Sequence, residues 1–580
     1  MRSDSSRRDL LGPGLLLAAL ALLLWRCTLT FCWSDEGFYL ALAHRFWLGD
    51  LPFVDEWNTA QLYAPFLLPF YALWRAVTGG TAGIYLAARV TAVLLQFALA
   101  FALYRALRPR GRGTALAAAL LVLVYAKAGI GGLSYYTLCY LFFGTGLLLF
   151  YIACETGPAA RTGLCFAAGA VMAPAVVCMP YLAVLWVLPA AVLLLPSARG
   201  RRGPVLAFLG GTGAAALVYL AWLLHRVSLS ELLEYLPFVL MDPDGSDTSL
   251  PVLALKALVQ PFYQFRFGLL FWGGALAASL LLPRLRRVTP ASALSVKVRR
   301  LLLAAALAGF VVNLLTSGDM LGKAHLALCL LAVQCWLLTP PARRPVREAL
   351  CFFLPGWAFG LVWQVGSNTG FSGMTLGFAL ACAGAAPMVG ACLHCLREEG
   401  VLSRSTGRAL AALALCVPVL LSGWQRLALE YRDAPLSQCT QRLTSGPAAG
   451  LVTTPEHAAQ YTAICRALTE SESDGPVFVT ALAPWAYLCT DRPMGTSTSW
   501  RTYLDSELLE VYYQQHPERF PTTVLVLDEA VGGYTSTLQP EENSLPNQNS
   551  GREDGFLTLE LARRGFTAHT TPVGTVYEAG

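Results

Sequence analysis

The sequence predicts an α-helical multi-pass membrane protein that carries a water-soluble α/β domain at its C-terminal end. Of its 580 residues, 56% are hydrophobic and only 13% are charged, whereas soluble domains carry about 25% charged residues. The apolar residues gather in long Ala- and Leu-rich runs, and about 20 apolar residues in a helix cross the bilayer core. These runs lack the period-two alternation of an outer-membrane β-barrel, which excludes that class.

The apolar runs predict about 13 membrane-spanning helices, since backbone groups in lipid must be bonded within the segment. Basic residues cluster before the first run and in alternate loops after it. The positive-inside rule assigns those loops and the N-terminus to the cytoplasm, and the odd count places the C-terminal domain outside. We therefore expect a protein of the cell (plasma or inner) membrane. The predicted spans are 11–31, 85–106, 114–130, 133–153, 161–177, 180–196, 204–224, 267–283, 300–316, 324–339, 349–365, 374–396 and 408–423.

The charge balance calls for no nucleic-acid partner. The net charge of +6 comes from the cytoplasmic loops, where basic residues set the topology and contact anionic membrane lipid.

The long apolar runs end near Trp424, so residues 1–424 form a predicted transmembrane domain and 425–580 an extracytoplasmic α/β domain. Short β-branched segments at 476–480 and 522–527 predict buried strands. Helical patterns occupy 455–469, 502–515 and 556–564. Of the cysteines Cys439, Cys465 and Cys489 in this domain, a disulfide between Cys465 and Cys489 is a candidate pairing.

The first outer loop, 32–84, concentrates polar residues directly after the first span. Asp35 and Glu36 open a segment whose apolar residues share one helical face through Trp47, which predicts an amphipathic helix on the membrane surface. A second acidic pair, Asp55 and Glu56, follows. The short apolar segment 65–74 is interrupted by prolines and predicts a re-entrant or interfacial helix.

This order of features resembles the first outer loop of the GT-C membrane glycosyltransferases, closest to the protein O-mannosyltransferase and lipid A aminoarabinose transferase lineage. The resemblance covers residues 30–110 in detail and the rest as topology. It implies transfer of a sugar from a polyprenyl-phosphate donor to an envelope glycan, lipid or protein on the outer face. Asp35 matches the acid that this family places in its active site. The matching features are Asp35-Glu36, the surface helix, Gly49-Asp50, Asp55-Glu56, Tyr63, Pro65 and the second span opening at Tyr85 to Arg89.

The sequence departs from this pattern at one point that bears on the donor. The aminoarabinose transferases carry a Glu-Lys-Pro motif where this chain has Tyr63-Ala64-Pro65, so the phosphate-binding lysine of that motif is missing. Lys323 in a short outer loop is the substitute phosphate ligand that we predict, with Arg89 at the head of the second span as its rival. In the alternative interpretation, Lys323 extends to the lipid headgroups and His325 is an ordinary hydrogen bond between helices. Tyr63 and His325 are further candidate substrate contacts.

The reaction requires a base near the acceptor hydroxyl, because the lipid phosphate is already a good leaving group. Asp35 is the predicted base, with Glu36 coupled to it. In the alternative interpretation, both carboxylates only stabilise the N-terminus of the surface helix.

Asp55 and Glu56 have three candidate roles: contacting the acceptor, holding a divalent metal, or lying in a solvated loop. No cofactor follows with certainty from the sequence.

Two other functional classes share the membrane spans. A polysaccharide polymerase or ligase would carry Arg-rich outer loops, and here those loops are acidic and aromatic. A lipid-linked sugar flippase or transporter would place charges in the middle of its spans and show inverted repeats. Intraspan charges such as Lys127 are few and lie near span ends.

Overall fold

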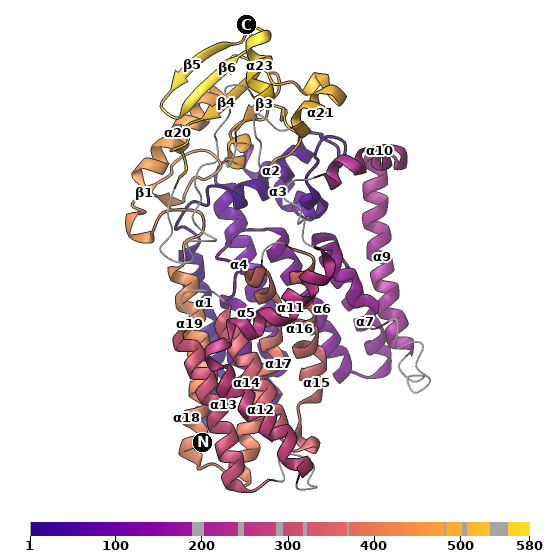
Figure 1. Ribbon diagram of the computed structural model, residues 1–580, viewed down its shortest axis with the longest axis vertical. Coiled ribbons are helices and arrows are strands. Elements are labelled where there is room, and N and C mark those ends of the chain that lie inside the picture. The colour runs from indigo at the N-terminus through magenta and orange to yellow at the C-terminus, as the bar shows by residue number, and fades with distance from the viewer. Residues whose placement is uncertain are drawn as a thin grey trace.

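The computed structural model is an elongated helical body that carries a small sheet domain at one end (Figure 1). The N-terminus lies at the far end of the helices and the C-terminus in the sheet domain (Figure 1). The structure describes residues 2–187, 189, 202–241, 249–285, 294–316, 322–367, 370–480, 483–500, 507–533 and 555–580.

The predicted fold class is confirmed: the described part of the chain contains nine helices long and apolar enough to cross a membrane. Every predicted span except the sixth corresponds to a helix. The sixth, 180–196, begins as the short helix η3 (Pro180–Trp186), and most of its remaining residues lie outside the described ranges. The helices of the body are α1 (Arg2–Arg26), α4 (Ile84–Leu107), α5 (Arg112–Val124), α6 (Tyr135–Glu155), α7 (Pro158–Cys178), α9 (Arg202–Arg226), α12 (Arg266–Leu285), α13 (Val296–Thr316), α14 (Lys323–Leu338), α16 (Leu354–Val365), α17 (Gly370–Glu398) and α19 (Val417–Ala428).

Small residues allow the helices of the body to approach closely. A Cβ atom on Gly377 of α17 would lie 2.3 Å from the carbonyl oxygen of Gly356 on α16. Lipid supplies no hydrophobic force between helices, so such close packing is what stabilises their association.

Two further helices lie between the predicted spans 204–224 and 267–283, in a segment for which the sequence analysis names no element. They are α10 (Leu229–Leu240) and α11 (Leu250–Gln264). Both expose apolar side chains, Leu233 and Leu258 among them.

The first outer loop folds into α2 (Asp35–Trp47), the 3-10 helix η1 (Thr59–Phe66) and α3 (Leu68–Thr78). The predicted membrane-surface position of α2 is wrong. All its residues from Glu36 to Phe46 are buried, and it packs against η10 (Pro484–Cys489) of the C-terminal domain. The apolar periodicity predicts the helix correctly, but the apolar face of this helix is covered by protein instead of membrane lipid. The interfacial position of α3 stays a prediction.

The C-terminal domain is built on a four-stranded sheet with the order β3-β4-β6-β5. The predicted strands are β3 (Val477–Val479) and β4 (Thr523–Leu527), which pair in parallel. The hairpin of β5 (Thr567–Thr571) and β6 (Gly574–Glu578) was not predicted, because β5 is a polar and mostly exposed edge. Its helices are α20 (Pro455–Thr469), α21 (Glu507–Gln515) and α23 (Phe556–Arg563).

Cys465 and Cys489 form a disulfide, as predicted, which joins α20 to η10. Cys439 is a free thiol.

The C-terminal domain and the first outer loop share one hydrophobic core. Phe31 packs on Tyr461 and Trp485 with ring centroids 5.4 and 5.3 Å apart, and Trp33 lies 5.2 Å from Trp485. All four rings are buried. The C-terminal domain is therefore continuous with the start of the chain.

Candidate functional site

Glu36 and Arg89 form a buried ion pair at the junction of α2 and α4. Arg89 Nη2 lies 2.6 Å and Nε 2.8 Å from Glu36 Oε2. The other oxygen, Oε1, accepts from the backbone N–H groups of Gly131 and Gly132 at 2.7 and 3.0 Å. Arg89 Nη1 donates to the carbonyls of Cys27, Leu29 and Thr30. These contacts give both residues a structural role; the catalytic role predicted for Glu36 and the phosphate contact predicted for Arg89 stay predictions.

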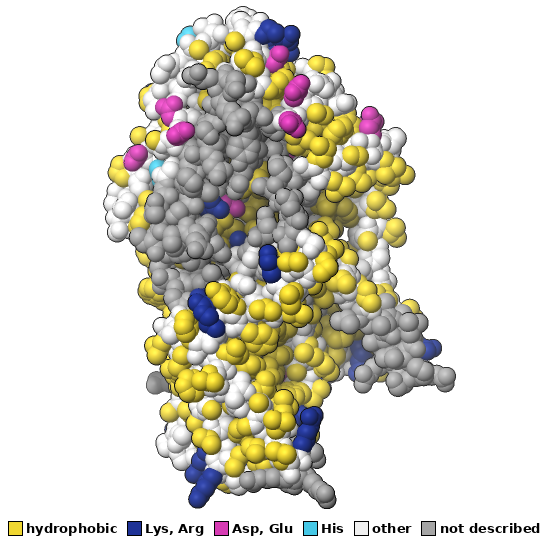
Figure 2. All heavy atoms as spheres, viewed as in Figure 1, with side chains coloured by type: hydrophobic (Ala, Val, Ile, Leu, Met, Phe, Trp, Pro, Cys, Tyr) yellow, Lys and Arg dark blue, Asp and Glu magenta, His cyan; other side chains and the backbone are white. Residues whose placement is uncertain are grey.

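Asp35 stands beside this pair but keeps a partly accessible side chain. It opens α2, accepts from Ser34 Oγ at 2.9 Å, and lies 3.6 Å from Arg432 Nε. Both side chains of the Asp35–Arg432 pair are 14% exposed. In the space-filling view, basic and acidic side chains lie next to each other in a recess where the sheet domain meets the helices (Figure 2). Of the two predicted acids, Asp35 has the more exposed side chain, 14% against 4% for Glu36.

Arg432 adopts a backbone conformation that non-glycine residues rarely take. Its φ is +56°, a left-handed value that costs about 1 to 3 kcal/mol and persists only where neighbours enforce it. Its carbonyl accepts from Trp33 N–H at 3.0 Å. The next residue, Asp433, is fully buried and bonded to Phe31 N–H at 2.6 Å and to His457 Nδ1 at 2.8 Å. The first loop thus fixes the position of Arg432.

Lys127 approaches the same place from the turn after α5. Its Nζ lies 4.8 Å from the ring centroid of Tyr136, and its residue is 9% exposed. Asp35 also interacts electrostatically with Tyr136. Ala128 is left-handed with φ +49°, and a Cβ on Gly129 would contact Tyr431 at 3.5 Å, so this turn packs against the segment that bears Arg432.

Tyrosine rings surround Asp35. Tyr39 packs on Tyr63 and Tyr135 with centroids 5.9 and 5.8 Å apart, and Tyr135 lies 4.0 Å from Tyr136. Burial raises the pKa of Tyr39 well above its usual range, and the charge of Asp35 adds to this effect. Tyr39 and Tyr63 therefore stay neutral hydroxyl groups. Tyr63, a predicted contact, belongs to this group.

Three arginines lie behind the site at the ends of α1, α4 and α19. Arg26, Arg89 and Arg426 are buried, and all interact electrostatically with the single carboxylate of Glu36. Charges in a low-dielectric environment interact strongly. The carboxylate of Glu36 is therefore shared among three guanidinium groups.

The second acidic pair serves a different purpose. Arg45 is fully buried and binds Asp50 at 2.6 Å and Glu56 at 3.1 Å. Arg519 of the C-terminal domain binds Asp50 at 2.9 Å and Asp55 at 3.0 Å. Asp55 and Glu56 thus fasten the loop to the C-terminal domain. Both are buried, so the solvated-loop alternative is wrong, while contact with the acceptor or a metal stays a prediction. Within the described ranges, no three His, Cys, Asp or Glu side chains are grouped as a metal site.

Lys323 and His325 lie at the start of α14. His325 is fully buried, its Nε2 is 3.2 Å from the carbonyl of Leu121, and its ring packs on Tyr125. This is a helix-to-helix contact, so substrate binding by His325 is not supported. Lys323 is half-buried, and its predicted role stays a prediction.

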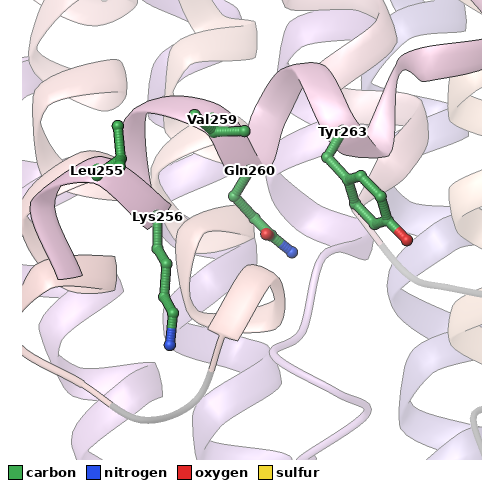
Figure 3. Close-up of a pocket in the computed structure, with 5 residues that line it drawn as sticks. All are labelled: Leu255, Lys256, Val259, Gln260 and Tyr263. Carbon is green, nitrogen blue, oxygen red and sulfur yellow. The ribbon is translucent and has the colours of Figure 1, made fainter. Parts of the chain in front are cut away.

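A separate hollow of about 360 Å³ lies along α11. Its five lining side chains, Leu255, Lys256, Val259, Gln260 and Tyr263, all belong to this one helix (Figure 3). It holds no acidic residue, and we assign it no role.

His44 gives the docking of α2 a predictable pH dependence. It is bonded to Tyr71 Oη and to the carbonyl of Thr490, and burial lowers its pKa from 6.5 to about 4. The unfolded state therefore binds more protons, so stability is present above pH 6.5 and is lost as the pH falls towards 4. We expect the parent to lose about 2 kcal/mol between pH 7 and pH 5 through this group.

Thermal unfolding in detergent checks this expectation. The melting temperature of the parent should fall more between pH 7 and pH 5 than that of His44→Gln, which carries no titrating group. Equal falls would contradict it.

The sequence analysis did not single out Arg432, and it treated Lys127 only as a charge near the end of a span. A signal for Lys127 was available, because a lone ammonium at the end of an apolar run is costly unless it has a function. Arg432 gave no signal, since basic residues are common after a last span.

Comparisons with known proteins found distant structural similarities alone. No family model and no curated protein matches the chain. Among solved structures, it is similar to the oligosaccharyltransferase AglB of Archaeoglobus fulgidus in complex with an inhibitory peptide and a dolichol-phosphate. The sequence identity is 12% and the TM-score 0.44, over 99% of this chain and 74% of that one. It is also similar to ArnT of Cupriavidus metallidurans bound to undecaprenyl phosphate, at 14% identity and TM-score 0.39, over 98% and 97% of the two chains.

Proposed function

We propose that the protein is an integral-membrane glycosyltransferase. It moves a sugar from a polyprenyl-phosphate donor to a glycan, lipid or protein of the cell envelope, on the extracytoplasmic face. The observation that carries the proposal is the Asp35–Arg432 ion pair at the end of an apolar helical body, with Lys127 over the ring of Tyr136, which also interacts with Asp35. A carboxylate paired with one cation and a second cation in the same region suit a hydroxyl acceptor and a phosphate leaving group.

In the proposed step, the acceptor oxygen bonds to the anomeric carbon of the sugar while the bond from that carbon to the phosphate oxygen breaks. The electron pair of the broken bond leaves with the polyprenyl phosphate. The acceptor proton passes to Asp35. Atoms and charge balance without an oxidant, a reductant or a second protein acid.

Arg432 and Lys127 take the phosphate in this proposal, and they replace Arg89, whose N–H groups bind Glu36 and backbone carbonyls. Lysine binds phosphate as a point charge, while the fork of arginine binds it in a fixed geometry. Lys323 remains a proposed additional ligand.

Reconstitution tests the proposal. Protein in vesicles that contain polyprenyl-phosphate sugars and envelope acceptors should release polyprenyl phosphate as the acceptor becomes glycosylated. Lys127→Met should lower kcat/KM about 10- to 150-fold, because a hydrogen bond to a charged group contributes about 1.5 to 3 kcal/mol.

Lys297→Met is the matched control, since Lys297 is exposed at the start of α13. It should leave the rate unchanged. Equal rates for the parent and Lys127→Met would remove Lys127 from the site, and no release with any donor would overturn the proposed function.

A further inference from the structure

We propose that Tyr63, Tyr135 and Trp363 form the subsite that binds the sugar of the donor. This inference rests on the proposed function and adds the part of the protein that recognises the transferred group. Its basis is a pair of buried polar atoms that lack partners in the described part of the chain and belong to side chains packed on the same ring.

Tyr63 and Trp363 each carry such an atom. The hydroxyl of Tyr63 and the indole Nε1 of Trp363 have no hydrogen-bond partner within the described part of the chain. Tyr63 is 1% exposed and Trp363 is fully buried. Buried tyrosine and tryptophan usually find a partner for the O–H or N–H, because leaving it unbonded costs free energy.

Both side chains pack on Tyr135, which opens α6. The ring centroids of Tyr63 and Tyr135 lie 5.6 Å apart, and those of Tyr135 and Trp363 lie 6.3 Å apart with planes only 1° from parallel. Tyr135 itself is half-buried. The two side chains that carry unpartnered groups therefore pack on one half-buried ring.

The chemistry of this group suits a sugar. An indole N–H only donates, so it needs an oxygen acceptor, while a tyrosine hydroxyl donates or accepts. A sugar offers hydroxyl oxygens at its edge and C–H groups on its face, which suit aromatic rings. Neither an acid nor a base lies among these three residues.

The position also fits a sugar that is attached to a phosphate. Tyr136 lies 4.0 Å from Tyr135 and carries Lys127 over its ring at 4.8 Å. The proposed phosphate ligand and the proposed sugar subsite are thus neighbours, as one bond between sugar and phosphate requires.

Binding to nanodiscs that carry the full-length protein tests the inference. The probes are undecaprenyl phosphate alone and undecaprenyl phosphate bearing glucose, galactose, mannose or N-acetylglucosamine. We expect the parent to bind at least one sugar-bearing lipid more tightly than the bare lipid. Tyr63→Phe and Trp363→Phe should each weaken binding of that lipid about 3- to 10-fold and leave the bare lipid unaffected.

Tyr85→Phe and Trp357→Phe are the matched controls. Each also loses a buried, unpartnered polar atom, but Tyr85 packs on Phe31, and Trp357 packs on Phe353 and Phe378. Neither control should change either affinity. Melting temperatures verify that every variant is folded.

The inference is overturned if the two subsite variants change both affinities equally or change neither, or if no sugar increases the affinity of the parent. The proposed function fails by a different result, the absence of polyprenyl phosphate release. A protein that releases polyprenyl phosphate with unchanged sugar affinity in Tyr63→Phe would keep its function and lose this subsite.

Discussion

Asp35→Asn should lower kcat for sugar transfer about 10²- to 10⁴-fold, the usual contribution of a positioned base. Asparagine has nearly the shape of aspartate and is accepted equally well at a helix N-terminus. Ser34 Oγ keeps an oxygen to bond to. The variant therefore removes the proton acceptor and leaves α2 in place. Released polyprenyl phosphate, measured at saturating donor, gives the rate.

This substitution separates the base from the alternative in which Asp35 only stabilises the start of α2. In that case the rate would hardly change. If Asp35 served only to orient Arg432, 3.6 Å away, KM for the donor would change in place of kcat. Asp491→Asn is the matched control, because Asp491 is a 58% exposed acid paired with Arg75 at the edge of the loop.

Arg45→Met should destabilise the protein by about 3 to 5 kcal/mol, the cost of breaking a buried ion pair from one side. Arg45 is fully buried between Asp50 and Glu56, and its Nη2 also donates to the carbonyls of Asp55 and Thr496. Its removal leaves Glu56 in the core without a cation. Ser499, through its N–H and Oγ, and the N–H of Asn58 would still bond that carboxylate.

The melting temperature and protease cleavage between the loop and the C-terminal domain measure this effect. Arg75→Met is the control, because the Arg75–Asp491 pair is largely exposed on the Asp491 side and such pairs contribute about 0 to 1 kcal/mol. Adding Glu56→Gln to Arg45→Met should restore part of the stability. Equal melting temperatures for Arg45→Met and Arg75→Met would contradict the role of Arg45.

The helical body was predictable because its helices are long segments of uniformly hydrophobic sequence. A run of about 20 apolar residues has the length and composition to cross the lipid bilayer, and in lipid its backbone must form a helix. The helix α20 was also predicted over its full length, 455–469. The edge strand β5 escaped prediction because its polar residues give no burial signal.

The site was only partly predictable, because contacts between distant segments decide which charges are used internally. Asp35 and Glu36 are adjacent and look alike in the sequence, yet Glu36 is bonded to Arg89 and two backbone N–H groups, while Asp35 is partly exposed. Arg432 pairs with Asp35 although the two residues are almost 400 positions apart in the sequence. No local pattern carries information of that kind.

The common core of Phe31, Trp33, Tyr461 and Trp485 has a consequence for how the protein is made. The segment that follows the first span leaves the ribosome long before its partners. Its aromatic rings therefore stay without their packing partners while the intervening helices insert. We infer that a nascent chain is inactive until its last quarter has been translated, and that release of a truncated chain exposes these rings to the quality-control proteases of the membrane.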